Sequence, residues 1–99
     1  NYIKTHVMTT AEFAKKDPKK KYQYIYIDGD HSYHGVKLDY KLFYSKLEKG
    51  GLMSFHDIVA TGELAGGLYG VNKFWRELKS NKKISFPFPS NSGLGFIQK

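Results

Sequence analysis

Residues 24–33 of the chain are Tyr24-Ile25-Tyr26-Ile27-Asp28-Gly29-Asp30-His31-Ser32-Tyr33. The first four residues are aromatic or β-branched, which is typical of a strand that is buried on both faces. Ligands of α/β proteins bind at the carboxyl ends of such strands. We therefore interpret Asp28, Asp30 and His31 as candidate site residues. The structural alternative is an Asp-Gly turn in which Asp30 begins a helix cap.

A second apolar segment ends in the same way. Residues 50–55 lead from two glycines through an apolar run into His56 and Asp57. In a parallel sheet, two strands that end in polar residues present them at the same edge, where they meet in one site. A structural histidine is the alternative for His56 alone. The repeated pattern favours a shared site.

The segments around these strands predict alternation with helices. Residues 2–8 alternate loosely and predict a strand. Thr9 and Glu12 have the spacing of a capping box, which predicts a short helix that stops at Asp17-Pro18. A longer helix is expected after the turn, because apolar residues recur there at helical spacing. It would include Leu47 and end at Lys49-Gly50-Gly51, a cationic last turn followed by glycine.

The last third of the chain predicts one more helix and two strands. The helix is marked by apolar residues at helical spacing between Val71 and Leu78. The strands are residues 84–88 and 94–97, joined by a turn at residues 89–93. We therefore expect an α/β fold with a mostly parallel sheet, an antiparallel C-terminal pair of strands, and helices on both faces.

Composition restricts the class of protein. The 99 residues suffice for a single domain, and the absence of cysteine excludes disulfides and thiolate metal sites. The net charge is +7, but the excess is spread along the chain and includes a single arginine, so nucleic-acid binding is not favoured. No segment has the length or apolar character of a membrane span, and no signal peptide is evident. A cytoplasmic location is the expectation.

These motifs together resemble the C-terminal half of class I S-adenosylmethionine-dependent methyltransferases. The resemblance lies in the segment from Asp28 to Tyr33, in Lys49-Gly50-Gly51, in Phe55-His56-Asp57, and in Gly70-Val71 with Phe74-Trp75. The nearest type has an Ile-Asp-Gly-Asp-His motif after its fourth strand. The resemblance covers the chain from Tyr22 onward and implies a Rossmann-like sheet that ends in a reversed hairpin.

One part of the family pattern has no counterpart in this chain. The resemblance assigns most of the cofactor contacts to a glycine-rich loop after the first strand and to an acidic residue after the second. No strand followed by a Gly-x-Gly motif precedes residue 24. We therefore expect residues 1–99 to be one domain that lacks the N-terminal cofactor-binding half, and to be inactive alone. An exposed sheet edge at residues 2–8 would favour self-association.

The resemblance also implies roles for the site residues. Asp28 would contact the cofactor, and His31, together with Asp30, would serve catalysis, with His31 as the general base on an acceptor hydroxyl. Some of these O-methyltransferases bind magnesium, and the corresponding ligands would be Asp28, His56 and Asp57. Carboxylates suit Mg²⁺, whereas an imidazole is more usual for a transition metal.

Two functions of different class remain open from the sequence. The first is the C-terminal part of a methyltransferase that acts on the oxygen of a small hydroxylated acceptor. The second is a non-catalytic methyltransferase-like domain that serves association or binds an acidic partner through its basic surface. The sequence does not identify the acceptor, because loops such as residues 60–69 carry no recognisable signature.

Overall fold

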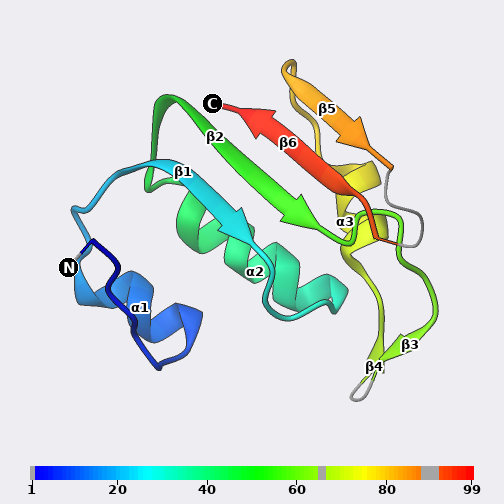
Figure 1. Cartoon of the computed structure of the whole chain (residues 1–99), viewed down its shortest axis with the longest axis horizontal. Coiled ribbons are helices and arrows are strands. Elements are labelled where there is room, and N and C mark those ends of the chain that lie inside the picture. The colour runs from blue at the N-terminus through cyan, green and yellow to red at the C-terminus, as the bar shows by residue number, and fades with distance from the viewer. Residues whose placement is uncertain (1, 65–66, 88–91) are drawn as a thin grey trace.

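The computed structural model describes residues 2–64, 67–87 and 92–99, and it has an α/β fold (Figure 1). In chain order, the elements are α1 (Thr10–Lys16), β1 (Tyr22–Ile27), α2 (Tyr33–Tyr44), β2 (Leu47–His56), β3 (Glu63–Leu64), β4 (Gly67–Leu68), α3 (Val71–Glu77), β5 (Lys83–Phe86) and β6 (Leu94–Gln98). The predicted helix and strand segments are thus confirmed from Thr10 onward, apart from the boundaries discussed below. Phe88 and residues 89–91 of the predicted hairpin lie outside the described residues.

The main sheet is mixed. Its strand order is β1-β2-β6-β5, with β1 parallel to β2, and with β6 antiparallel to both β2 and β5. The expectation of a mostly parallel sheet was therefore wrong for the described residues. The reason is that β6 lies between β2 and β5, so that two of the three strand pairs are antiparallel. The antiparallel C-terminal pair itself is confirmed. Strands β3 and β4 form a separate two-stranded ladder.

Residues 2–8 do not form the predicted strand. They have no helical or strand structure, and the side chains of Tyr2 and Val7 are almost fully exposed. A loose alternation of apolar residues gives a strand only where another strand pairs with it and a core receives one face. Neither is present in the described residues, so that β1 is an outer strand of the sheet.

The boundary between α2 and β2 also differs from the prediction. The helix ends at Tyr44, and Leu47 is the first residue of β2, where it pairs with Tyr22. The Leu47 side chain is 1% exposed. Its helical spacing from Phe43 therefore reflects burial in the same core, because both the end of the helix and the start of the strand face that core. The turn with a positive φ at Gly50 lies within β2 and not after a helix.

The core lies between one face of the sheet and helices α2 and α3. Phe55 of β2 is fully buried, and its ring contacts those of Tyr40 on α2 and of Phe74 and Trp75 on α3. Helix α1 packs beside α2, with the Phe13 and Phe43 rings stacked. Figure 1 shows the sheet in front of α2 and α3. This layer fixes the positions of β1 and β2, which carry the candidate site.

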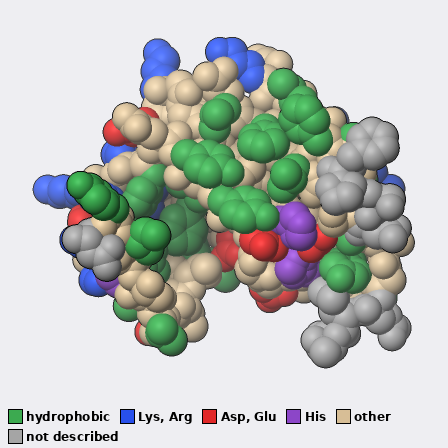
Figure 2. Space-filling model, viewed as in Figure 1, with side chains coloured by type: hydrophobic (Ala, Val, Ile, Leu, Met, Phe, Trp, Pro, Cys, Tyr) green, Lys and Arg blue, Asp and Glu red, His purple; other side chains and the backbone are tan. Residues whose placement is uncertain are grey.

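The opposite face of the sheet is open. Tyr24 and Tyr26 of β1 are 53% and 48% exposed, and Leu52, Ile84 and Phe86 on the other strands are also exposed. Figure 2 shows hydrophobic side chains spread over the visible face of the molecule. The expectation that residues 24–27 are buried on both faces was therefore wrong, as was that of helices on both faces. Residues 24–27 form an apolar run because the second face of the sheet is also apolar, although the described residues do not cover that face.

Candidate active site at the strand ends

The carboxyl ends of β1 and β2 bring four candidate residues together. Ile27 pairs with Phe55 in the parallel register, so that Asp28 and His56 follow at adjacent strand ends. Asp28, His31, His56 and Asp57 each offer one ligand-type atom, and these atoms lie within 4.8 Å of one another. Figure 2 shows acidic and histidine side chains gathered beside the apolar sheet face. We call these four residues the Asp-His cluster.

In the Asp-His cluster, each of the two imidazoles contacts both carboxylates. His31 Nε2 lies 2.6 Å from Asp57 Oδ2 and 3.4 Å from Asp28 Oδ1. His56 Nδ1 lies 3.2 Å from the same Asp28 oxygen and 3.0 Å from the same Asp57 oxygen. Each nitrogen therefore approaches both carboxylates, which is an arrangement that can hold a cation or a polar group of a ligand between them.

The backbone at Asp57 explains how two consecutive residues reach the same cluster. Neighbouring side chains of an extended strand point to opposite faces. Asp57 has a φ of 64°, the one positive φ of a non-glycine residue in the described part of the chain. Its backbone N–H donates to the Gly93 carbonyl at 3.1 Å, which holds this turn in place. Left-handed backbone is tolerated by aspartate, and such strain is found at functional sites.

The loop before α3 holds His31 in position. The backbone N–H of Gly70 donates to the His31 carbonyl at 2.7 Å, and the ring of Tyr69 packs edge-on against the imidazole. A Cβ atom at position 70 would lie 2.1 Å from the Tyr33 nitrogen, so that a glycine is needed for this close approach. His31 thus contacts the loop at residues 69–70 and the carboxylate of Asp57, and its side chain is 23% exposed.

Asp30 lies outside the Asp-His cluster. Its Oδ1 accepts a hydrogen bond from the backbone N–H of Ser32 at 2.8 Å, while Ser32 itself caps α2. The backbone and then the side-chain hydrogen bond of Ser32 lower the pKa of Asp30 below its usual value. A Cβ at Gly35 would lie 2.3 Å from the Asp30 Cγ, which shows how closely this carboxylate packs on the first turn of α2. The contacts of Asp30 are thus those of a turn residue that holds the N-cap residue of α2.

Tyr26 is a neighbour of the cluster that sequence reasoning missed. Partial burial and then the negative charge of Asp28 raise the pKa of the Tyr26 hydroxyl, which is also hydrogen bonded to Asp28. Its ring stands edge-on to that of His56. The available signal was the period of two along a strand, which places Tyr26 on the same side as Asp28.

A pocket of about 330 Å³ opens beside Asp28. It is mostly apolar and lies between α1, β1 and α2, with Phe13, Ile25 and Phe43 among its lining residues. Asp39 also lines it, and burial raises the pKa of this carboxyl. The volume lies at the lower end of the range of small-molecule sites.

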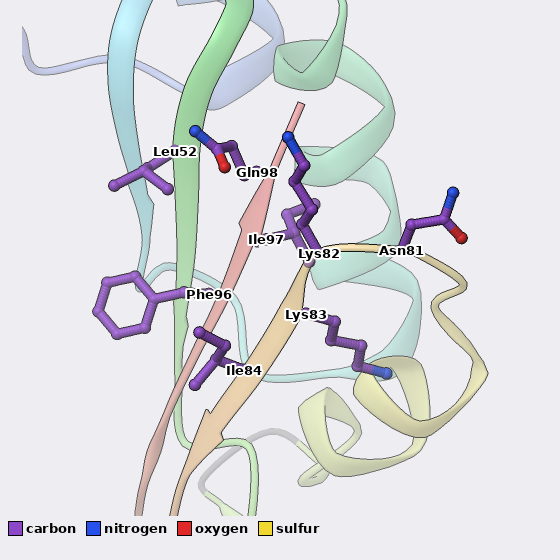
Figure 3. Close-up of a pocket in the computed structure, with 8 residues that line it drawn as sticks. All are labelled: Leu52, Asn81, Lys82, Lys83, Ile84, Phe96, Ile97 and Gln98. Carbon is purple, nitrogen blue, oxygen red and sulfur yellow. The ribbon is translucent and has the colours of Figure 1, made fainter.

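A second pocket, of about 400 Å³, is remote from the cluster (Figure 3). Figure 3 shows Leu52, Ile84 and Phe96 pointing to one side and Asn81 and Lys83 to the other, so that its lining does not converge. Leu52 is four residues before His56, or about 13 Å along the strand. The pocket beside Asp28 is therefore the better candidate.

The chain is similar to methyltransferases. The family described as "Methyltransferase domain" matches residues 1–58. The chain belongs to this family. The matched residues include α1, β1, α2, β2 and all four residues of the Asp-His cluster. The predicted methyltransferase resemblance is thus confirmed at the level of the family.

Two relatives of this methyltransferase domain are uncharacterized proteins. One, from Sinorhizobium fredii, is 34% identical over 73 residues, which are 74% of this chain and 8% of the relative. Another, from Acanthamoeba polyphaga mimivirus, is 31% identical over 75 residues, which are 70% of this chain and 34% of the relative. The chain thus spans about a third or less of these relatives. No solved structure matches it significantly.

None of the described helices is long and apolar enough to cross a membrane.

Proposed function

We propose that this domain is the C-terminal part of a class I, S-adenosylmethionine-dependent methyltransferase that methylates an oxygen of a small hydroxylated acceptor. The observation that carries the proposal is the Asp-His cluster at the ends of β1 and β2, within a domain of the methyltransferase family. When bound, S-adenosylmethionine supplies the methyl group. The residues of this chain would bind the acceptor and hold its hydroxyl in line for transfer, which is where most of the rate enhancement would arise.

The cofactor is proposed to lie beside Asp28. The carboxylate of Asp28 borders both the Asp-His cluster and the mostly apolar pocket of about 330 Å³, so that a molecule in that pocket would reach the cluster. This position supports the cofactor role that the sequence predicted for Asp28. It also supports a Rossmann-like relation of the two strands, because ligands of such sheets lie beyond the carboxyl ends of parallel strands.

His31 is the candidate general base for the acceptor hydroxyl. Imidazole is the usual general base of enzymes near neutral pH, and the carboxylate of Asp57 lies 2.6 Å from Nε2, where it would hold the ring in position. The predicted catalytic role of Asp30 is kept as a second part of the proposal. Its contacts with Ser32 support a positioning role, in which it holds the turn that carries His31.

The proposal is tested on the full-length protein that contains this domain. The purified protein is incubated with S-adenosylmethionine and a set of small phenols and sugars, and S-adenosylhomocysteine is measured by mass spectrometry. We expect turnover with at least one acceptor, and a loss of roughly 10²–10⁴-fold in His31→Ala. His34→Ala is the matched control, because His34 is an exposed histidine of α2 outside the cluster.

Two results would contradict this function. Full activity in both His31→Ala and Asp28→Ala would remove the cluster from catalysis. No turnover with any acceptor, combined with binding of an acidic partner, would instead favour the non-catalytic domain. The isolated 99-residue chain should bind S-adenosylmethionine weakly or not at all in calorimetric titration. Micromolar binding would show that the remaining strand ends suffice.

A further inference from the structure

The donor atoms of the Asp-His cluster do not suit magnesium. Mg²⁺ is bound in proteins through oxygen and keeps several waters, whereas imidazole nitrogen suits zinc, iron, nickel and copper. The cluster presents two imidazole nitrogens and two carboxylate oxygens. We infer that the cluster binds one divalent transition-metal ion of the zinc type, with His31 as a ligand through Nε2. This inference replaces the general-base role proposed for His31 and leaves the rest of the proposed function in place, because it assigns an ion to the site proposed for the acceptor.

The distances within the cluster fit ligands that share one ion. Metal–ligand bonds of about 2.0–2.1 Å place neighbouring ligand atoms about 3.3 Å apart in a tetrahedron. In an octahedron with bonds of the same length, adjacent ligands are about 3.0 Å apart. The four nitrogen–oxygen distances run from 2.6 to 3.4 Å. The nitrogen–oxygen distances thus match those of adjacent ligands, while the four ligand atoms as a set lie within 4.8 Å of one another and would draw together on binding an ion.

The environment of His31 Nε2 is a second, independent observation. This atom is buried and has no hydrogen-bond partner among the described residues, although a carboxylate oxygen of Asp57 lies only 2.6 Å away. Of the four contacts in the cluster, that between His56 Nδ1 and Asp28 is a hydrogen bond. Buried polar atoms are rarely left without a partner, and a bound ion would supply one for this nitrogen.

The charges of the cluster also favour a cation. Asp28 and Asp57 bring two negative charges to a space in which their oxygens contact the same two imidazoles. A divalent ion would neutralise both carboxylates while leaving the imidazoles neutral. The side chains of Asp28 and His56 are 40% and 32% exposed, so that one side of the site is open to a ligand. Catalytic metal sites keep such an open position.

This inference and the base role of His31 exclude each other. Nε2 cannot accept a proton while it binds an ion through the same lone pair. In the ion-bound cluster, His31 would act as a ligand, and the acceptor hydroxyl would be deprotonated elsewhere. Metal binding is measured without cofactor or acceptor, so its failure would leave the proposed methyl transfer standing. Conversely, failure of methyl transfer would leave the inferred metal binding standing.

The test is a metal titration of the 99-residue chain, produced without a histidine tag and treated with a chelator. Zinc and magnesium are titrated by calorimetry, and cobalt by its visible absorption. We expect zinc to bind at micromolar concentration or below, and magnesium at least about 100-fold more weakly. His31→Ala and His56→Ala should each weaken zinc binding at least about tenfold. The exposed control His34→Ala should leave it unchanged.

A second measurement uses the unmodified chain, so that the inference can be tested even if the alanine variants do not fold. In the unmodified chain, the ¹⁵N resonance of His31 Nε2 should shift on addition of zinc, and the resonances of His34 should not. Equal affinity for zinc and magnesium, or absence of zinc binding, would overturn the inference. So would zinc binding without a shift at His31 Nε2, because the ion would then lie elsewhere.

Discussion

Asp30 offers a sharp test of the difference between a catalytic carboxylate and a structural one. Its Oδ1 accepts the backbone N–H of Ser32 at the start of α2. A hydrogen bond to a charged group contributes about 1.5–3 kcal/mol, and the solvent exposure of Asp30 reduces this to about 1 kcal/mol. For a domain of this size, about 1 kcal/mol lowers the Tm by about 4–8 °C. We expect that loss in Asp30→Ala.

Asp30→Asn is the matched control, because the amide oxygen can accept the same hydrogen bond. We expect it to retain more than half of the stability lost in the alanine variant. The pH dependence follows from the lowered pKa of Asp30. The folded-state pKa lies below the usual value of 3.8, so that the stabilisation is present above pH 3.8 and is lost as the pH falls through the folded-state pKa. The Tm difference between the unmodified chain and Asp30→Ala should shrink accordingly.

The assay is thermal unfolding followed by circular dichroism between pH 2 and pH 7. An unchanged Tm in Asp30→Ala at pH 7 would refute this structural role. Equal losses in the alanine and asparagine variants would refute the hydrogen-bond argument. In the full-length protein, a catalytic Asp30 would instead show a large loss of turnover in Asp30→Asn, with the Tm retained.

Three further predictions concern the core, a buried carboxyl and association. Phe55→Ala should lower the free energy of unfolding by about 3–5 kcal/mol in urea denaturation, because the fully buried ring contacts Phe74 and Trp75; a loss below about 1 kcal/mol would contradict this packing. Burial raises the pKa of Asp39, so its contribution to stability is present at low pH and lost as the pH rises through the folded-state value. Asp39→Asn should therefore be more stable than the unmodified chain at pH 7, with the advantage decreasing toward pH 4; the opposite trend in thermal unfolding would show that Asp39 is stabilised as an anion. Light scattering should give a mass above 11.4 kDa, since β1 is an outer strand whose second edge is unpaired among the described residues; a monomer at all concentrations would argue against self-association.

The elements that the sequence predicted well are those whose signals are local. Thr9 and Glu12 formed the expected cap of α1, and the Thr9 side chain accepts from the Glu12 backbone. The apolar runs before Asp28 and His56 became β1 and β2. The errors concern partners that lie far away in the sequence. Among the described residues, no strand pairs with residues 2–8, and the direction of β6 between its neighbours could not be inferred from its own residues.

The candidate site was also predicted where the signal is local, and it was missed where the arrangement depends on residues distant in the sequence. Strand ends predicted that Asp28, His56 and Asp57 would lie near one another, because that follows from the parallel pairing of their strands. Two other features of the site have no local signal in the sequence. Asp57 has a left-handed backbone, and His31 contacts the Asp57 carboxylate. Both features depend on the loops at Gly70 and Gly93, which are distant in the sequence. The turn contacts of Asp30 had a local signal, since a turn with a capping role was the stated alternative.

The pairing of Ile27 with Phe55 has a consequence for how this site can change over evolutionary time. The spacing between Asp28 and His56 is set by backbone hydrogen bonds between two neighbouring strands, about 4.8 Å apart, rather than by a flexible loop. Inserting or deleting one residue in β2 would move every following side chain to the other face of the sheet. New chemistry at these strand ends is therefore accessible through replacement of side chains, and hardly through changes in strand length.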